Sequence, residues 1–122
     1  MIIGQTMFSV RRGTEHRANA ALDEMGKLLA GCDGLYRFRI LRSVGMSPLA
    51  SELGKVGREA ALEDDHYLVQ AEWESIEAHD RFFSSEGLQR CYGLLGSVLT
   101  SGPYEVLYQP MVEQPVRTGV AA

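Results

Sequence analysis

The sequence has little of what marks several large classes of protein. It contains two cysteines, few lysines and no long apolar run among its 122 residues. Two cysteines are too few for a disulfide framework, and Cys32 and Cys91 do not form a CxxC pair. No segment approaches the roughly 18 apolar residues of a membrane-spanning helix, and the first residues lack the charge order of a secretion signal. These features predict a cytoplasmic protein that does not enter a membrane.

An excess of basic charge is also absent. The formal net charge is -4 and the pI is near 5.3. A nucleic-acid-binding domain normally carries a basic surface, so nucleic acid is not expected as a partner. The length suits one compact domain. We expect this domain to occupy residues 1–110, followed by a disordered C-terminal tail at residues 111–122.

Motifs for catalysis and metal binding are equally scarce. The sequence contains no Gly-rich phosphate loop, no GxSxG nucleophile elbow and no paired-carboxylate motif. Asp64, Asp65 and His66 are consecutive, but neighbouring strand residues point to opposite faces and cannot all bind one ion. Since no other His or Cys lies at a ligand spacing, the sequence predicts no metal site.

What the sequence does contain is regular alternation. Apolar side chains at every second position predict strands at residues 2–11, 35–42, 66–73 and 103–110. Helical spacing predicts one helix at residues 14–32, capped by Thr14, and a second one that starts after Ser75 and is interrupted at residues 84–87. A connection of about 20 residues, 43–64, joins the second and third strands, and loops of this length are usually functional or mobile.

This order of elements predicts an α+β fold of the ferredoxin-like βαββαβ type, a four-stranded antiparallel sheet with two helices on one face. The side chains expected to face the helices are Phe8, Val10, Tyr36, Phe38, Ile40, Tyr67, Val69, Trp73, Val106 and Tyr108. The opposite face is expected to hold six apolar side chains, those of Ile3, Met7, Leu35, Leu41, Leu68 and Leu107. Because an exposed apolar patch usually marks an interface, the sequence predicts a homodimer formed through this sheet face.

Several features of the second half of the chain point to a known family. They are an aromatic-rich strand ending at Trp73, Glu74-Ser75 at the helix start, Glu77-Ala78-His79 followed by Phe82, and a short strand from Tyr104 to Tyr108 after Gly-Pro. In these features the chain resembles the antibiotic biosynthesis monooxygenase-like domains of the dimeric α/β-barrel superfamily. The resemblance covers about residues 2–110, except the 43–64 connection, which is longer than the family's usual one.

The resemblance implies a cleft between sheet and helices in each subunit of a dimeric barrel. Some members oxidise polycyclic aromatic phenols there without metal or flavin, the substrate anion itself reducing dioxygen. Others degrade haem, and these carry an Asn on the first strand, a Trp at the end of the third, and a His about ten residues later. Trp73 fits, but the first strand has no Asn and Phe83 stands where that His is expected. Neither haem nor any other cofactor is therefore expected.

Candidate site residues are those that would face such a cleft. His79 lies beside the apolar stripe of the second helix and could act as a general base toward an acidic phenol. Trp73 could stack on a planar substrate and donate its indole N–H. The same cavity could be lined by Tyr36, Tyr67, Phe82, Phe83, Tyr92 and Tyr108. For every one of these residues, packing in or at the edge of the core is the alternative.

Two functions of different class remain open. The first is a cofactor-independent monooxygenase-like enzyme acting on a small aromatic or quinone-like metabolite. The second is a non-catalytic dimeric module that binds a small hydrophobic ligand or a partner, and the lack of a dedicated acid–base pair favours it. A cavity of a few hundred Å³ that contains His79 and a Tyr hydroxyl would favour the enzyme. Solid packing between sheet and helices would argue against it.

Overall fold

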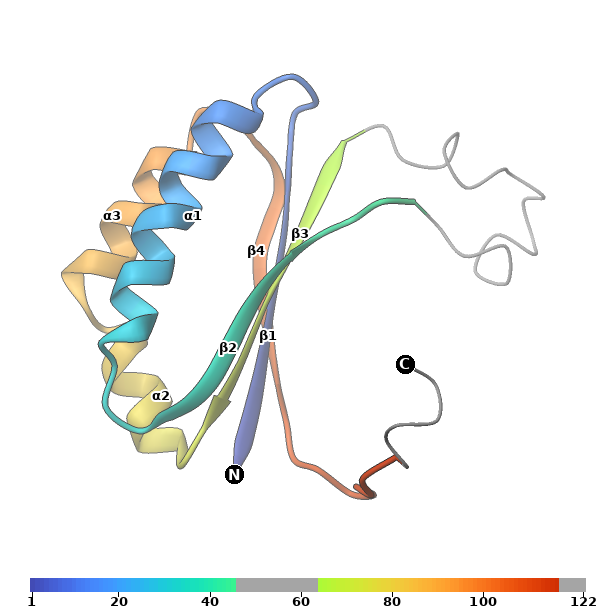
Figure 1. Cartoon of the computed structure of the whole chain (residues 1–122). Coiled ribbons are helices and arrows are strands. Elements are labelled where there is room, and N and C mark those ends of the chain that lie inside the picture. Colours follow the sequence, from blue (N-terminus) through green and yellow to red (C-terminus); the bar gives the residue numbers. More distant parts are fainter. Residues whose placement is uncertain (46–63, 117–122) are drawn as a thin grey trace.

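The computed structural model describes residues 1–45 and 64–116, which form a four-stranded antiparallel sheet with three helices on one face (Figure 1). The strands are β1 (Ile2–Val10), β2 (Leu35–Arg42), β3 (Asp65–Trp73) and β4 (Leu99–Tyr108), and the helices are α1 (Glu15–Ala30), α2 (Ile76–Phe83) and α3 (Glu86–Leu95). The sheet order is β2-β3-β1-β4, which confirms the predicted ferredoxin-like α+β fold. Most of the 43–64 connection and the end of the tail, residues 46–63 and 117–122, lie outside the described residues.

Serine caps explain why the second predicted helix is two helices. The Ser75 hydroxyl accepts a hydrogen bond from the Ala78 amide at 3.2 Å, and the Ser85 hydroxyl accepts one from the Leu88 amide at 3.3 Å. Two caps ten residues apart therefore start two helices, α2 and α3, as the predicted interruption requires. Thr14 also precedes its helix, but the predicted cap bond is wrong, because its hydroxyl donates to the Arg11 carbonyl oxygen instead.

The hydrophobic core lies between the sheet and the helices. Phe8, Val10, Tyr67, Val69 and Trp73 face the helices and are buried, as the alternation predicts. The helices contribute the buried side chains of Ala18, Ala21, Leu22, Met25, Leu29, Ala78, Phe82, Leu88, Cys91 and Leu95. Cys91 and Cys32 are free thiols, and burial raises the pKa of Cys91, as expected of a cysteine that packs as a small hydrophobe.

On β2 the structure corrects the predicted face of Tyr36. The pairing with β3 shifts register between Leu35 and Arg37, so Tyr36 has no partner on β3 and is 65% exposed. An extra residue in one strand reverses the sheet face to which the side chains on one side of it point. Leu35, predicted on the opposite face, consequently packs against the core, together with Phe38.

On β4 the predicted face is reversed. Glu105 pairs with Thr6 and Leu107 pairs with Gly4, and these partners lie on the helix side of β1. Val106 and Tyr108 therefore lie on the other side and are 43% and 44% exposed, so their predicted contact with the helices is wrong. The apolar side chains of Val106 and Tyr108 thus lie on the sheet face without helices, and the Glu105 carboxylate lies on the helix side.

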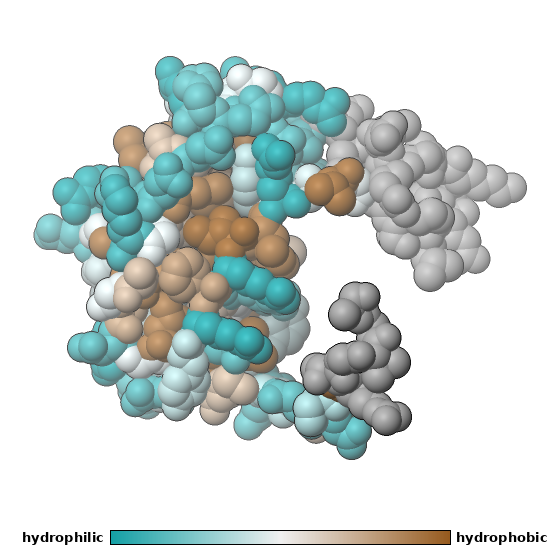
Figure 2. All heavy atoms as spheres, in the orientation of Figure 1, coloured by the Kyte–Doolittle hydropathy of each residue, from teal (hydrophilic) through white to brown (hydrophobic). Residues whose placement is uncertain are grey.

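We call the sheet surface without helices the open face. It carries the apolar side chains of Ile3, Met7, Leu41, Leu68, Tyr104, Val106 and Tyr108, and between them lie Gln5, Arg37, Arg39, Gln70 and Glu72. Arg37 forms an ion pair with Glu72, and Arg39 donates to the Gln70 side chain at 2.7 Å. Figure 2 shows hydrophobic groups on this side of the molecule, interrupted by hydrophilic side chains.

Candidate active site

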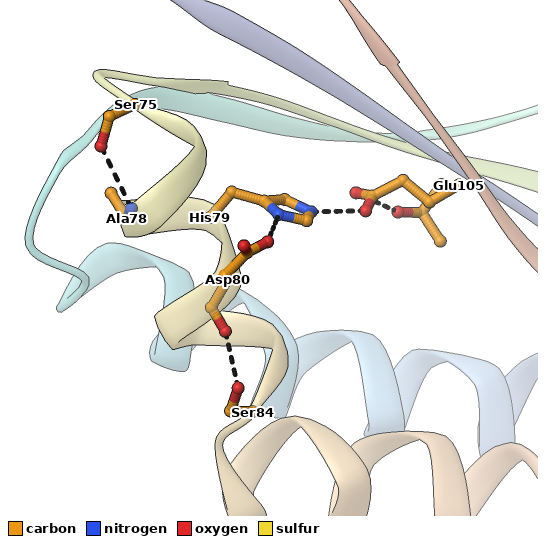
Figure 3. A network of polar contacts seen from close by, with 7 residues as sticks. Ser75, Ala78, His79, Asp80, Ser84 and Glu105 are labelled. Carbon is orange, nitrogen blue, oxygen red and sulfur yellow. Dashed lines mark hydrogen bonds and ion pairs between the residues drawn. The ribbon is translucent and has the colours of Figure 1, made fainter.

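Helix α2 directs His79 toward the sheet, where the imidazole lies between two carboxylates (Figure 3). His79 is 6% exposed. Its Nε2 is 2.5 Å from Glu105 Oε1, and its Nδ1 is 2.8 Å from Asp80 Oδ1. An ionised carboxylate only accepts hydrogen bonds, so two ionised partners require a proton on both ring nitrogens. The geometry thus favours an imidazolium that bridges a largely buried carboxylate and an exposed one.

Glu105 reaches His79 because β1 leaves room for its side chain. The Thr6 hydroxyl donates to Glu105 Oε2 at 3.0 Å, on the neighbouring strand. Gly4 is the next helix-side residue of β1, and a Cβ there would lie only 2.8 Å from Glu105 Oε2. Sequence reasoning missed Glu105 because the alternation of β4 assigned it to the other face. A single acidic residue within an otherwise apolar strand is the signal that could have found it.

Aromatic rings enclose this ion pair. The imidazole of His79 stacks on Phe83 with the ring centroids 4.4 Å apart, and meets Trp73 edge-on at 5.9 Å. The Phe82 ring is tilted against Trp73, with the ring centroids 5.5 Å apart. The Trp73 indole N–H is buried and has no hydrogen-bond partner among the described residues. Since buried N–H groups are nearly always paired, this one is free to donate a hydrogen bond to the oxygen of a water or a ligand.

Tyr92 brings a hydroxyl to the same region from α3. Burial, and after it the negative charge of Glu105, raises the pKa of Tyr92 to about 12. A neutral phenol next to a carboxylate can donate a hydrogen bond throughout the physiological pH range. Tyr92 also meets Phe8 edge-on, with the ring centroids 6.4 Å apart, which fixes the ring in the core.

Very little free volume remains between these groups. A cavity of about 10 Å³ is bordered by Thr6, Met25, Leu29, Val69, Ala71, Trp73, Phe82, Phe83, Leu88, Tyr92 and Glu105. Such a volume holds about one water molecule. Glu105 borders this cavity, whereas its partner His79 does not. The space expected for an aromatic substrate is therefore occupied by side chains in this conformation.

The structure brings most of the predicted site residues together. His79, Trp73, Phe82, Phe83 and Tyr92 all lie around the small cavity or the ion pair beside it. The three remaining candidates lie elsewhere. Tyr67 is buried at the opposite end of β3, where it stacks on Phe8 at 5.3 Å, and Tyr36 and Tyr108 are exposed and do not border the cavity.

The acidic segment before β3 does not gather around a common point. Asp64 accepts a hydrogen bond from Thr100 at 2.8 Å, while His66 Nδ1 lies 2.5 Å from the Ser9 hydroxyl oxygen. Among residues 1–45 and 64–116, no three His, Cys, Asp or Glu side chains lie close enough to hold a metal ion. No helix in this part of the chain is both long and apolar enough to span a membrane.

One family model matches most of the chain, and several solved structures share its fold. A family model described as antibiotic biosynthesis monooxygenase matches residues 1–93. A candidate antibiotic biosynthesis monooxygenase from Deinococcus radiodurans superposes with a TM-score of 0.72 at 12% identity, over 96% of this chain and 99% of that one. SnoaB, a cofactor-independent oxygenase from Streptomyces nogalater, gives 0.67 at 14% identity, over 94% and 97%. Rv0793 from Mycobacterium tuberculosis gives 0.68 at 17% identity, over 93% and 98%. None of the curated proteins matches the chain.

Proposed function

The chain belongs to the antibiotic biosynthesis monooxygenase family, and from this membership we propose that it is a cofactor-independent monooxygenase-like enzyme for a small aromatic or quinone-like metabolite, with a phenol as the form that reacts. One observation carries the proposal. Glu105, a largely buried carboxylate, borders an aromatic-lined cavity and is held there by His79 and Thr6. A buried charge is costly unless it is paired and hydrogen-bonded, and such arrangements are typical of functional sites. The fold shared with SnoaB supports the same reaction class.

The placement of the two ionisable groups assigns them different roles in the proposal. Glu105 borders the cavity, so its carboxylate takes the proton from the substrate. His79 does not border the cavity and holds that carboxylate in place with its imidazolium charge. This replaces the expectation from the sequence that His79 itself is the base. The Trp73 N–H and the Tyr92 hydroxyl donate hydrogen bonds to substrate oxygens.

The chemistry requires only the substrate and dioxygen. Loss of a proton to Glu105 leaves an electron-rich phenol anion, which transfers an electron to dioxygen. The resulting radical and superoxide combine to form a carbon–oxygen bond, and protonation gives a hydroperoxide. In an anthrone-type phenol the carbon that binds dioxygen is a ring CH₂ group, and loss of water from its hydroperoxide converts this carbon to a carbonyl. The substrate loses four electrons in total, while one oxygen atom enters the product and the other leaves as water.

Substrate entry requires α2 to move, because the present cavity of about 10 Å³ cannot hold an aromatic ring. Phe82 and Phe83 on α2 border this cavity, and His79 on the same helix is tied to β4 through Glu105. A displacement of the last turn of α2, which carries Phe82 and Phe83, would therefore enlarge the cavity while His79 stays paired with Glu105 on the sheet. Gating motions of this kind are common in enzymes that exclude water from the reaction.

Oxygen consumption with an anthrone-type phenol tests the proposal. We expect the wild-type chain to consume dioxygen and to form the corresponding quinone with one molecule of dioxygen per product. Glu105→Gln should abolish this activity, and Glu77→Gln, an exposed residue at the start of α2, should leave it unchanged. Identical rates in the wild-type and Glu105→Gln chains would remove Glu105 from the mechanism. No uptake with any phenol of this class would contradict the enzyme proposal.

The filled interior favours the second candidate function, a non-catalytic dimeric module. A core with room for one water has the packing expected of a purely structural domain. In that case the His79–Glu105 pair would only fix α2 on the sheet. The two functions differ in one simple result, since the non-catalytic module consumes no dioxygen while its stability still depends on Glu105.

We also propose that two copies pair through the open face. Tyr104, Val106 and Tyr108 are between 43% and 62% exposed there, an unusual amount of apolar surface for a sheet. Arg37 is paired with Glu72 within the same chain, so this charge stays paired when two such faces meet. Sedimentation should show a dimer at micromolar concentration, and a stable monomer would contradict the proposal.

A further inference from the structure

A groove lies in the helix layer, where the end of α1 and its turn toward β2 meet α2 (Figure 1). Its lining includes the apolar side chains of Leu28, Ala78 and Phe82, and the exposed charged side chains of Asp33 and Arg81. Its volume is about 290 Å³. Sites for small molecules begin at about 300 Å³, so the groove has the size of a small binding site, whereas the cavity beside Glu105 does not.

Phe82 separates this groove from the cavity. Among the described residues it is the one that lines both spaces, and it is 8% exposed. Its ring lies against Trp73, which borders the cavity from the sheet. The two hollows on the open face share no residue with the cavity, because the sheet lies between them. The cavity is therefore one side chain away from the groove.

We propose that the groove is the entrance through which the phenol reaches Glu105, and that Phe82 is its gate. The proposal rests on the proposed function and adds the route of the substrate and the residue that controls it. Rotation of the Phe82 ring away from Trp73 joins groove and cavity into one space. The reacting ring of the phenol then lies beside Glu105, and its remaining rings lie in the groove against Leu28 and Ala78.

The contacts of α2 hold its first turn in place and leave the Phe82 ring able to move. A Cβ at Gly34 would lie 2.6 Å from Ala78 Cβ, so the first turn packs closely on the connection between α1 and β2. His79, the next residue, is tied to β4 through Glu105. Phe82 lies about one helical turn further along, and its ring contacts are with other aromatic rings. Its rotation therefore breaks no hydrogen bond, as a gate requires.

Acrylamide quenching of Trp73 fluorescence tests the gate without any phenol. Trp73 is the only tryptophan and is 1% exposed, so a small quencher reaches it only where neighbouring side chains open. We expect Phe82→Ala to raise the Stern–Volmer quenching constant at least threefold. The matched control is Phe8→Ala, which removes an equally buried ring that borders neither groove nor cavity, and its constant should stay within 1.5-fold of wild type. Equal constants in the two variants, or no increase in Phe82→Ala, would overturn the gate.

Chemical modification of Cys32 tests the entrance in the wild-type chain. Cys32 lines the groove and is partly exposed, whereas Cys91 is buried, so N-cyclohexylmaleimide at alkaline pH should add to Cys32 alone. Stopped-flow fluorescence of Trp73 under anaerobic conditions then measures how fast an anthrone-type phenol binds. We expect the association rate constant to fall at least tenfold in the modified chain and to stay within twofold of untreated wild type in Cys32→Ser treated with the same reagent. An unchanged rate in the modified chain would overturn the entrance.

The outcomes separate the entrance from the proposed function. Phenol binding that is equally fast after modification of Cys32 would overturn the entrance while the proposed function stands. A wild-type chain that binds no phenol would contradict the proposed function, and the acrylamide comparison, which uses no phenol, would still support or overturn the gate. Circular dichroism verifies that each variant is folded. If Phe82→Ala does not fold, Phe82→Leu is compared with Phe8→Leu in the same way, with an increase expected in the first alone.

Discussion

Replacing Glu105 with glutamine separates the charge of the central ion pair from its shape. The two side chains are nearly the same size, so the aromatic packing around His79 should survive. In wild type, one carboxylate oxygen accepts from Thr6 and the other faces His79 Nε2 at 2.5 Å. Glutamine keeps one acceptor oxygen and turns the other position into a donor. One of these two hydrogen bonds is therefore lost or reversed, and the charge pair disappears.

The expected cost follows from burial. Removing one partner of a fully buried ion pair costs about 3–5 kcal/mol, and a hydrogen bond to a charged group contributes about 1.5–3 kcal/mol. His79 keeps Asp80 as a second partner, and the Glu105 side chain is 16% exposed, so we expect the lower end, about 2 kcal/mol. For a chain of this length that corresponds to roughly 6–10 °C in the unfolding midpoint.

Urea unfolding followed by fluorescence provides the assay, because Trp73 is the only tryptophan and lies beside His79. The matched control is Glu24→Gln, which breaks the ion pair with Lys27 on the surface of α1, away from the open face. The two side chains are 57% and 75% exposed, so this pair should contribute less than about 1 kcal/mol. If Glu105→Gln cost no more than Glu24→Gln, the buried pair would not organise this part of the fold.

Four further substitutions test the site and the fold that supports it. Gly4→Ala places a Cβ 2.8 Å from the Glu105 carboxylate, so it should destabilise the wild-type chain more than the Glu105→Ala chain, a difference that a double-mutant cycle measures. Tyr92 has a pKa raised to about 12, so its contribution to stability is complete below pH 10 and is lost between about pH 10 and 12. Tyr92→Phe should therefore reduce the loss of stability over that range, and an unchanged alkaline unfolding profile would contradict this. Gly26→Ala, with no atom within 4 Å of the new Cβ, should raise the unfolding free energy by about 0.5–1 kcal/mol. Gly34→Ala should lower it by more than that in the same urea assay, because its φ is +80° and the Cβ would lie 2.6 Å from Ala78 Cβ.

The central strands could be predicted from the sequence because one face of each is buried by helices. On β1 and β3 the alternation correctly assigns Phe8, Val10, Tyr67, Val69 and Trp73 to the core. The break between α2 and α3 was equally predictable, since serine caps are local signals.

The edge strands could not be assigned in the same way. The register shift beside Tyr36 depends on how β2 pairs with β3, and alternation within one strand contains no information about pairing. On β4 the more apolar alternation belongs to the open face, so Glu105 was assigned away from the helices. Its correct side depends on a partner, His79, that is distant in sequence.

The free volume of the site was also beyond the sequence. Trp73, Phe82, Phe83 and Tyr92 border one small cavity, but a set of aromatic residues can either line a cavity or fill it. Ring orientations decide between these outcomes, and here the tilted and edge-on contacts fill the space. The proposed displacement of α2 is the physical condition under which the same rings would line a cavity.

Trp73 fluorescence under anaerobic conditions tests the central claim most directly, that the space between sheet and helices beside Glu105 receives a planar phenol. Exclusion of dioxygen separates binding from turnover, and the single indole lies within the site. We predict saturable quenching by an anthrone-type phenol in the wild-type chain, with at least tenfold weaker binding in Glu105→Gln and unchanged binding in Glu24→Gln. A wild-type chain whose fluorescence shows no saturable change would contradict the account.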